Sequence, residues 1–160
     1  MRKPPLPQPT VSRSVSLADC APVLEELLRA GGTVTLTVTG SSMCPFLAGG
    51  RDRVTLSAVT GRLKKNDLPL YRRPDGAFVL HRVVRVERDG SYRMCGDRQW
   101  QPELGVRQEQ LIAVASAYVR KGRTLTNRNI FYRLYRAAWT WLLPWRPRLF
   151  RWRARLRGNA

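Results

Sequence analysis

The sequence predicts a small, mainly β domain with a leading helix and a basic helical tail. Three observations predict this fold class. Short β-branched segments recur with turn residues between them, one amphipathic segment precedes them, and the apolar spacing changes to a helical period from about residue 126. The 160 residues suit one domain with a tail. We therefore expect a twisted sheet or barrel as the body.

The first segments are predicted from caps and alternation. Residues 1–15 are polar and proline-containing, which is typical of a flexible arm. Ser16 can cap a helix over residues 17–30, which the glycines at 31–32 would end. Residues 33–39 alternate Thr with Val or Leu, which indicates a strand with one apolar face.

Further strands are predicted by apolar runs between turn signals. The turns are RPDG at residues 73–76 and RDG at 88–90, where Pro and Gly supply the required backbone angles. The expected strands cover residues 53–59, 68–72, 78–87, 91–95 and 111–119. The body is thus expected to span residues 16–122, and the tail residues 123–160.

Composition excludes several classes of protein. An apolar content of 43% is too high for a wholly disordered chain. The three cysteines are too few for a disulfide scaffold, and they lack paired zinc-ligand spacing. We expect neither a metal nor a cofactor. No long apolar run predicts a membrane span, and no secretory signal is expected at the N-terminus, so we expect a cytoplasmic protein.

The positive charge is concentrated in the tail. The formal net charge is +18, and no acidic residue follows Glu109. Apolar residues recur at helical spacing from Ile130 to Leu142, before prolines at 144 and 147. Arginines mixed with tryptophans suit an anionic membrane surface, here the inner face of the cell membrane, through Trp139, Trp141, Trp145 and Trp152. The alternatives are a helix packed on its own domain and, less favoured, single-stranded nucleic acid.

Three polar residues at strand ends or in strands are candidates for catalysis. Ser42 follows the first expected strand, His81 is the only histidine, and Asp97 ends a hairpin. A serine nucleophile needs a base, and a neutral histidine oriented by an acid is such a base. Each residue is also compatible with an ordinary turn or core position, so spacing alone makes a weak case.

The residues around these candidates resemble the S24/S26 serine peptidase superfamily, and signal peptidase I in particular. Residues 40–45 (GSSMCP) resemble its Ser-Met-x-Pro box, and residues 63–71 (LKKNDLPLY) look like its Lys-x-Gly-Asp strand. Residues 79–84 (VLHRVV) resemble the His-Arg box of the endoplasmic-reticulum and archaeal type, and residues 94–99 (MCGDRQ) the Gly-Asp-Asn box. The four boxes occur in family order.

The resemblance implies a serine endopeptidase that cleaves a precursor or leader peptide. Ser42 would be the nucleophile and His81 the general base, and Asp97 would support His81 or the geometry of the site. Ser41 and Met43 would support the oxyanion site. The peptide would bind as an added strand. The alternative is an inactive peptidase fold that binds a peptide or a partner at the membrane surface.

The sequence also departs from the family. Asn66 stands where the family has Gly, although Asn tolerates the left-handed region, and Arg98 stands where Asn is expected. Glu103 falls near the second acid of the His-type enzymes. The related self-cleaving repressors carry a DNA-binding domain and use a lysine base. Residues 17–30 offer one helix, which is too little for such a domain.

Overall fold

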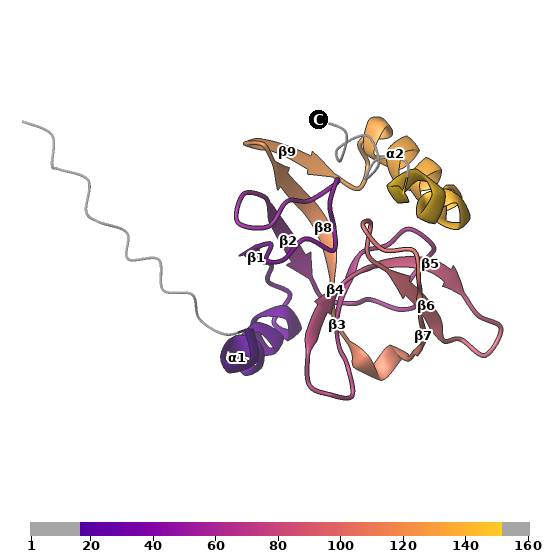
Figure 1. Cartoon of the computed structure of the whole chain (residues 1–160). Helices are drawn as coiled ribbons and strands as arrows, with labels where there is room; N and C mark the ends of the chain where they lie inside the picture. Colours follow the sequence, from indigo (N-terminus) through magenta and orange to yellow (C-terminus); the bar gives the residue numbers. More distant parts are fainter. Residues whose placement is uncertain (1–16, 152–160) are drawn as a thin grey trace, which may run out of the picture.

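The protein is mainly β, as its sequence predicts (Figure 1). The computed structural model describes residues 17–151, so the expected arm at residues 1–15, the expected helix cap Ser16 and Trp152 lie outside the described residues. The elements, in chain order, are α1 (Leu17–Arg29), β1 (Val34–Thr37), β2 (Arg53–Ser57), β3 (Pro69–Arg72), β4 (Phe78–Leu80), β5 (Arg82–Val86), β6 (Tyr92–Cys95), β7 (Glu103–Val106), η1 (Gln108–Gln110), β8 (Leu111–Arg120), β9 (Arg123–Thr126), α2 (Ile130–Trp141) and η2 (Leu143–Trp145).

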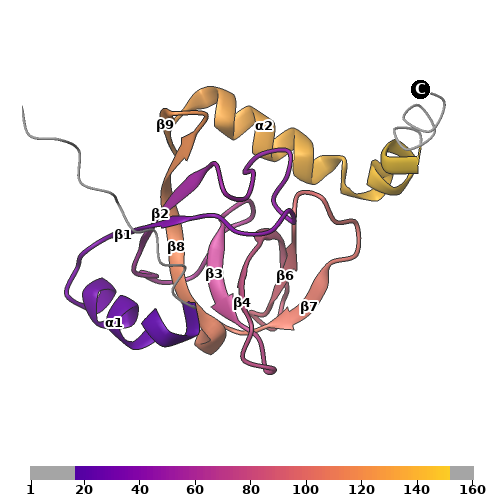
Figure 2. The same cartoon turned by 60° about the vertical axis from the view of Figure 1, so that its left-hand side comes forward.

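Two antiparallel sheets form the body. The larger sheet has the order β1-β2-β8-β3-β4, with β9 also paired to β8, and the smaller has the order β5-β6-β7. The larger sheet curls into a half-barrel, with α1 below it and α2 across its upper end in Figure 2. Among the described strands, β1, β4 and β9 each pair with a single neighbour and are the edge strands of this sheet. Each edge strand has one row of backbone groups without a strand partner.

The chain passes between the two sheets at His81. The prediction of one strand over residues 78–87 was wrong, because β4 ends at Leu80 and β5 begins at Arg82. β4 pairs with β3, whereas β5 pairs with β6. The apolar pattern continues through this point because both halves are at least partly buried, so the pattern cannot reveal the change of sheet.

The larger sheet continues beyond residue 122. Lys121 and Gly122 both have positive φ, at 50° and 77°, which is the backbone of a tight hairpin turn. β9 therefore pairs back along β8 and the helix begins only at Ile130, where the Asn129 side chain accepts a hydrogen bond from Tyr132 N at 3.0 Å. Strand β7, which contains Gly105, was not predicted.

Two hydrophobic clusters hold the fold. The larger lies between the half-barrel and both helices and includes Leu28, Leu56 and Tyr132. The smaller joins Tyr71 of the large sheet to Val83 and other residues of the small sheet. Leu80 packs against the larger cluster and Val83 belongs to the smaller one, so His81 lies between the two clusters, at the junction of β4 and β5.

Helix α2 packs its inner face on the body. Tyr132 is buried and its hydroxyl donates to Tyr118 Oη at 3.0 Å, while Trp139 Nε1 donates to Asp97 O at 2.9 Å. The structure thus places Trp139 against the domain. In residues 17–151, none of the helices has the length and apolar character needed to cross a membrane.

Candidate active site

Ser42 lies in a loop that is closed at its base. Val38 N donates to Asp52 O at 2.9 Å, and Gly50 N donates to Val38 O at 2.8 Å. Gly49 has no Cβ, and a Cβ there would overlap Gly40 O. The two ends of the loop therefore meet after β1, and this holds Ser42 at the end of an edge strand.

Ser42 and His81 line the same cavity, although 39 positions separate them in the sequence. The cavity has a volume of about 330 Å³. Its walls include the edge strands β1 and β4. The apolar lining residues are Leu17, Leu36, Val38, Met43, Val54, Leu56, Leu70, Phe78, Val79 and Leu80, and the further polar ones are Thr37, Thr39, Arg73 and Gln99. Met43 is 2% exposed and packs in the core, whereas Ser41 is exposed and is not among the lining residues.

His81 is held by a chain of hydrogen bonds that ends on an acid. Tyr71 Oη lies 3.4 Å from His81 Nδ1 and donates to Glu103 Oε2 at 2.7 Å. Since the tyrosine proton goes to Glu103, Tyr71 Oη accepts from Nδ1–H. This places the imidazole proton on Nδ1 and leaves the Nε2 lone pair available as a base. Arg73 completes the chain through Nη2, 2.6 Å from the same Glu103 oxygen.

Burial and charge set the protonation of this chain. Burial, and then the positive charge of Arg73, lower the pKa of His81 to about 4, against the opposing charges of Glu103 and Asp97. Burial raises the pKa of Glu103, but hydrogen bonds from Arg73 and Tyr71 outweigh it and the net pKa is lowered. Burial and the neighbouring Glu103 raise the pKa of Tyr71. At neutral pH, Glu103 is thus ionised and His81 is neutral.

We expect the His81 imidazole to titrate near pH 4 in the folded protein. The imidazole C–H resonances of His81, followed by NMR, give the midpoint of this titration. Arg73→Gln removes the repelling charge and should raise the midpoint, whereas Glu103→Gln removes the attracting charge and should lower it. Because the unfolded chain binds this proton near pH 6.5, folding stability should fall as pH drops from about 6.5 to 4, by about 3 kcal/mol in all. Equal midpoints in both variants would contradict this account.

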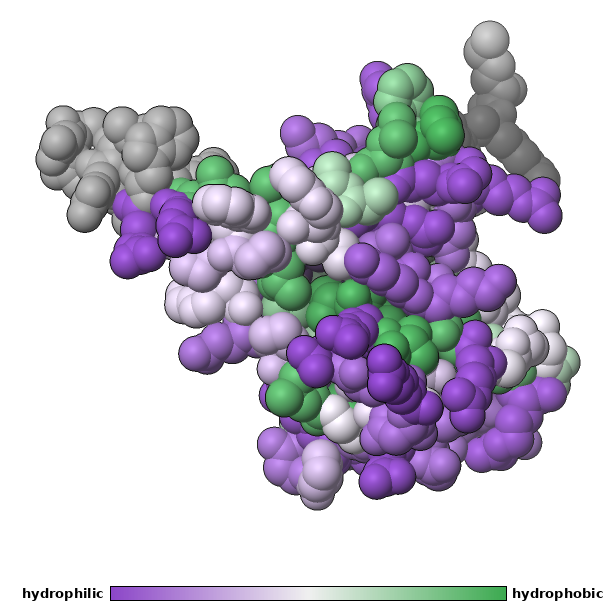
Figure 3. Space-filling view, turned by 90° about the vertical axis from the view of Figure 1, so that its right-hand side faces the viewer, coloured by the Kyte–Doolittle hydropathy of each residue, from purple (hydrophilic) through white to green (hydrophobic). Residues whose placement is uncertain are grey.

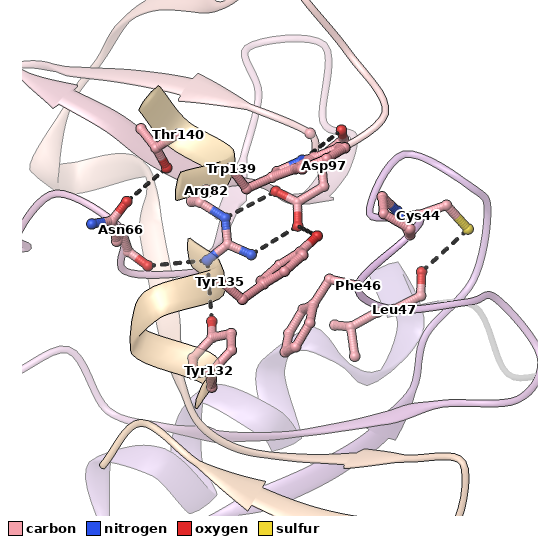
Figure 4. Close-up of polar contacts among 12 residues, drawn as sticks. Cys44, Phe46, Leu47, Asn66, Arg82, Asp97, Tyr132, Tyr135, Trp139 and Thr140 are labelled. Carbon is pink, nitrogen blue, oxygen red and sulfur yellow. Dashed lines mark hydrogen bonds and ion pairs between the residues drawn. The ribbon is translucent and has the colours of Figure 1, made fainter. Parts of the chain in front are cut away.

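Asp97 is paired with Arg82, not with His81 (Figure 4). Arg82 Nε and Nη2 donate to the two Asp97 oxygens, each at 2.9 Å, and both side chains are fully buried. Tyr135 also donates to Asp97 Oδ2 at 3.4 Å, and Arg82 Nη1 donates to Tyr132 Oη at 3.1 Å. The contacts of Asp97 thus join β5 and helix α2 to the loop that carries it.

The loop that carries Asp97 holds Ser42 directly. Arg98 N donates to Ser42 O at 2.8 Å, and a Cβ on Gly96 would lie 2.7 Å from that same oxygen. The tail also binds this loop, because the buried Arg146 donates two hydrogen bonds through Nη1, to Gly96 O at 2.9 Å and to Gln99 O at 2.8 Å. The glycine of this loop is therefore needed for close backbone contact with the Ser42 loop.

Sequence reasoning missed three residues of this site. The side chains of Tyr71 and Arg73 donate hydrogen bonds to Glu103. Gln99 lines the cavity, and its Oε1 accepts a hydrogen bond from Gly96 N at 3.0 Å. Tyr71 and Gln99 lie within the motifs at residues 63–71 and 94–99, but only the pairing of β3 with β4 shows that Tyr71 is next to His81. Cys44, two residues after Ser42, donates through its thiol to Leu47 O at 3.5 Å. The Cys44–Pro45 peptide bond is cis.

No protein-family model, curated protein or solved structure matches this chain.

Proposed function

We propose that the protein is a serine endopeptidase of the signal-peptidase-like kind, with Ser42 as nucleophile and His81 as general base. The observation that carries the proposal is the shared cavity, which is lined by the chain's only histidine and by a serine in a fixed loop. His81 offers a neutral Nε2, and its other nitrogen is engaged by Tyr71. The resemblance of the four sequence boxes supports the same assignment.

The substrate is an extended peptide of a precursor or leader. β1 and β4 are edge strands of the curled sheet and both line the cavity, so a peptide between them can pair its backbone as an added strand. Ser42 lies after β1, and His81 directly after β4. Such a peptide is therefore presented to both groups at once, with its side chains against aliphatic walls.

Cleavage follows from these positions. Ser42 Oγ attacks the scissile carbonyl carbon as its proton passes to His81 Nε2. The imidazolium then protonates the leaving amine, and a water activated by neutral His81 hydrolyses the acyl-enzyme. Glu103, acting through Tyr71, offsets the positive charge on the buried imidazole. Ser42 N–H and the Gln99 side-chain amide are the proposed oxyanion donors, in place of Ser41.

The test compares new protein N-termini produced by four variants. The wild type, Ser41→Ala, Ser42→Ala and His81→Ala are each purified and incubated with the same peptide library, and the products are read by mass spectrometry. We expect cuts with the wild type and with Ser41→Ala, the matched control for an exposed neighbouring serine, and none with the other two. Cuts that persist in Ser42→Ala would refute the nucleophile.

A second candidate function is binding without cleavage. In the part of the chain that the structure describes, no hydrogen bond joins Ser42 Oγ to His81, and a low pKa makes His81 a weak base. Apo sites often tighten only when substrate binds, so this geometry is compatible with either function. Saturable peptide binding with no cut in any variant would establish the binding module.

The proposed place of action is the cytoplasmic side of the cell membrane, where the protein would be peripheral. The support is the basic tail and the exposed Trp141 and Trp145, while Trp139 packs on the body.

A further inference from the structure

A second cavity lies between the β8–β9 hairpin and helix α2, and Ser42 is not among its lining residues. Its volume is about 630 Å³. Its walls combine cationic and aromatic side chains: Arg120, Lys121, Arg123, Phe46, Phe131, Tyr132 and Tyr135, with Leu125 and Asn129. No carboxylate lines it. A cavity of this kind favours an anionic ligand with an apolar part.

The cations of this region lack acidic partners. In the described part of the chain from Arg120 onward there are nine basic residues and no acidic one, and none of the nine forms an ion pair. Arg120 is engaged by backbone, because its Nε donates to Phe46 O at 2.8 Å. Lys121 and Arg123 are both exposed. Of the three cations that line the cavity, Lys121 and Arg123 are therefore more available to an anion than Arg120.

An apolar stripe runs outward from the same cavity. Phe131, which lines the cavity, is 78% exposed, and Leu134, Trp141 and Trp145 are 61%, 71% and 51% exposed. Phe131 and Leu134 are three residues apart, and Leu134 and Trp141 are seven apart, so these three lie on one side of α2, while Trp145 follows in η2. Figure 3 shows hydrophobic and hydrophilic surface side by side along the upper edge of one face. Large exposed apolar side chains in one row indicate an interaction surface.

We propose that this cavity binds the phosphate headgroup of an anionic phospholipid at a membrane surface. Lys121 and Arg123 meet the phosphate, and the stripe from Phe131 to Trp145 enters the boundary between headgroups and acyl chains. Tryptophan prefers that depth, and basic groups are drawn to anionic lipid. Leu134 has no ring on which a base could stack, so a nucleic acid would leave this part of the stripe uncovered, whereas acyl chains would cover it.

The site gives the proposed membrane location a specific ligand and a specific place, and it does not depend on peptidase activity. Ser42→Ala should therefore bind lipid like the wild type. Loss of cleavage and loss of lipid binding can thus be measured separately, and each proposal can fail without the other.

Sedimentation with phosphatidylcholine vesicles, with and without phosphatidylglycerol, tests the site. The test variant is Lys121→Glu/Arg123→Glu, and the matched control is Arg88→Glu/Arg107→Glu. The control makes the same change of charge at two exposed arginines that form no ion pair, one in the turn between β5 and β6 and one directly after β7. We expect the test variant to lose at least about thirtyfold in affinity for phosphatidylglycerol vesicles, and the control to lose much less.

The stripe is tested in the same assay. Phe131→Ser/Trp141→Ser should weaken binding and remove the part that persists at high salt, whereas Val23→Ser/Leu104→Ser, at similarly exposed positions elsewhere, should not. Circular dichroism of each variant confirms folding.

Three results would overturn the inference. Equal losses in the test and control charge variants would show general attraction of a basic protein. If inorganic phosphate displaced the wild type from phosphatidylglycerol vesicles as well as added phosphatidylglycerol vesicles do, the site would be one for free phosphate. If the wild type did not sediment with phosphatidylglycerol vesicles even at low salt, both the lipid site and the proposed membrane location would be refuted.

Discussion

Removing both the Ser42 hydroxyl and the His81 imidazole should cost no more activity than removing either alone. We expect Ser42→Ala, His81→Ala and the double variant each to lower kcat by at least about a thousandfold, to a common residual level. The reason is that the hydroxyl is a weak nucleophile until the imidazole takes its proton, so the two groups act as one unit. Single-turnover cleavage of one peptide found in the library screen measures all three.

The same measurement also tests whether the two residues act together. Losses that multiply in the double variant would show that Ser42 and His81 contribute independently, and this would contradict the proposed dyad. Tyr71→Phe is an informative partial variant, because it keeps the ring in the core but removes the hydroxyl between His81 and Glu103. Its effect should fall on kcat, with little change in peptide affinity.

Replacing Asp97 with alanine should destabilise the fold by about 3 to 5 kcal/mol. The change leaves the fully buried Arg82 guanidinium without its counter-ion, and an unpaired buried charge is among the most costly defects in a protein. Asp97 also accepts from Tyr135 of α2, so the docking of the tail should weaken too. Urea unfolding followed by fluorescence gives the free energy of unfolding.

A control pair separates burial from the loss of a charge. Glu25→Ala removes a half-buried carboxylate that pairs with two exposed arginines, Arg29 at 3.1 Å and Arg72 at 3.4 Å, and should change stability by less than about 1 kcal/mol. The double variant Arg82→Met/Asp97→Leu should be more stable than Asp97→Ala, because no charge remains buried. If Asp97→Ala behaved like Glu25→Ala, the central structural role assigned to the Arg82 pair would be refuted.

The sequence by itself determined the element types and most of their order. Strict alternation over residues 33–39 and the apolar spacing of residues 17–30, before the glycines at 31–32, predicted β1 and α1, because burial on one face imposes a period that the sequence displays. Asn66 was read correctly as tolerant of the left-handed region, and its φ is 78°. Ser42 and His81 could be singled out as candidates from their motifs.

Only the tertiary structure decided which residues meet. The division of the 78–87 segment between two sheets places His81 at their junction, and strand pairing brings Tyr71 and Glu103 to it from other parts of the chain. The same packing gives Asp97 to Arg82 and turns Trp139 inward while Trp141 stays exposed. Periodicity reports which face of an element is buried, whereas the partner on that face depends on contacts between residues far apart in sequence.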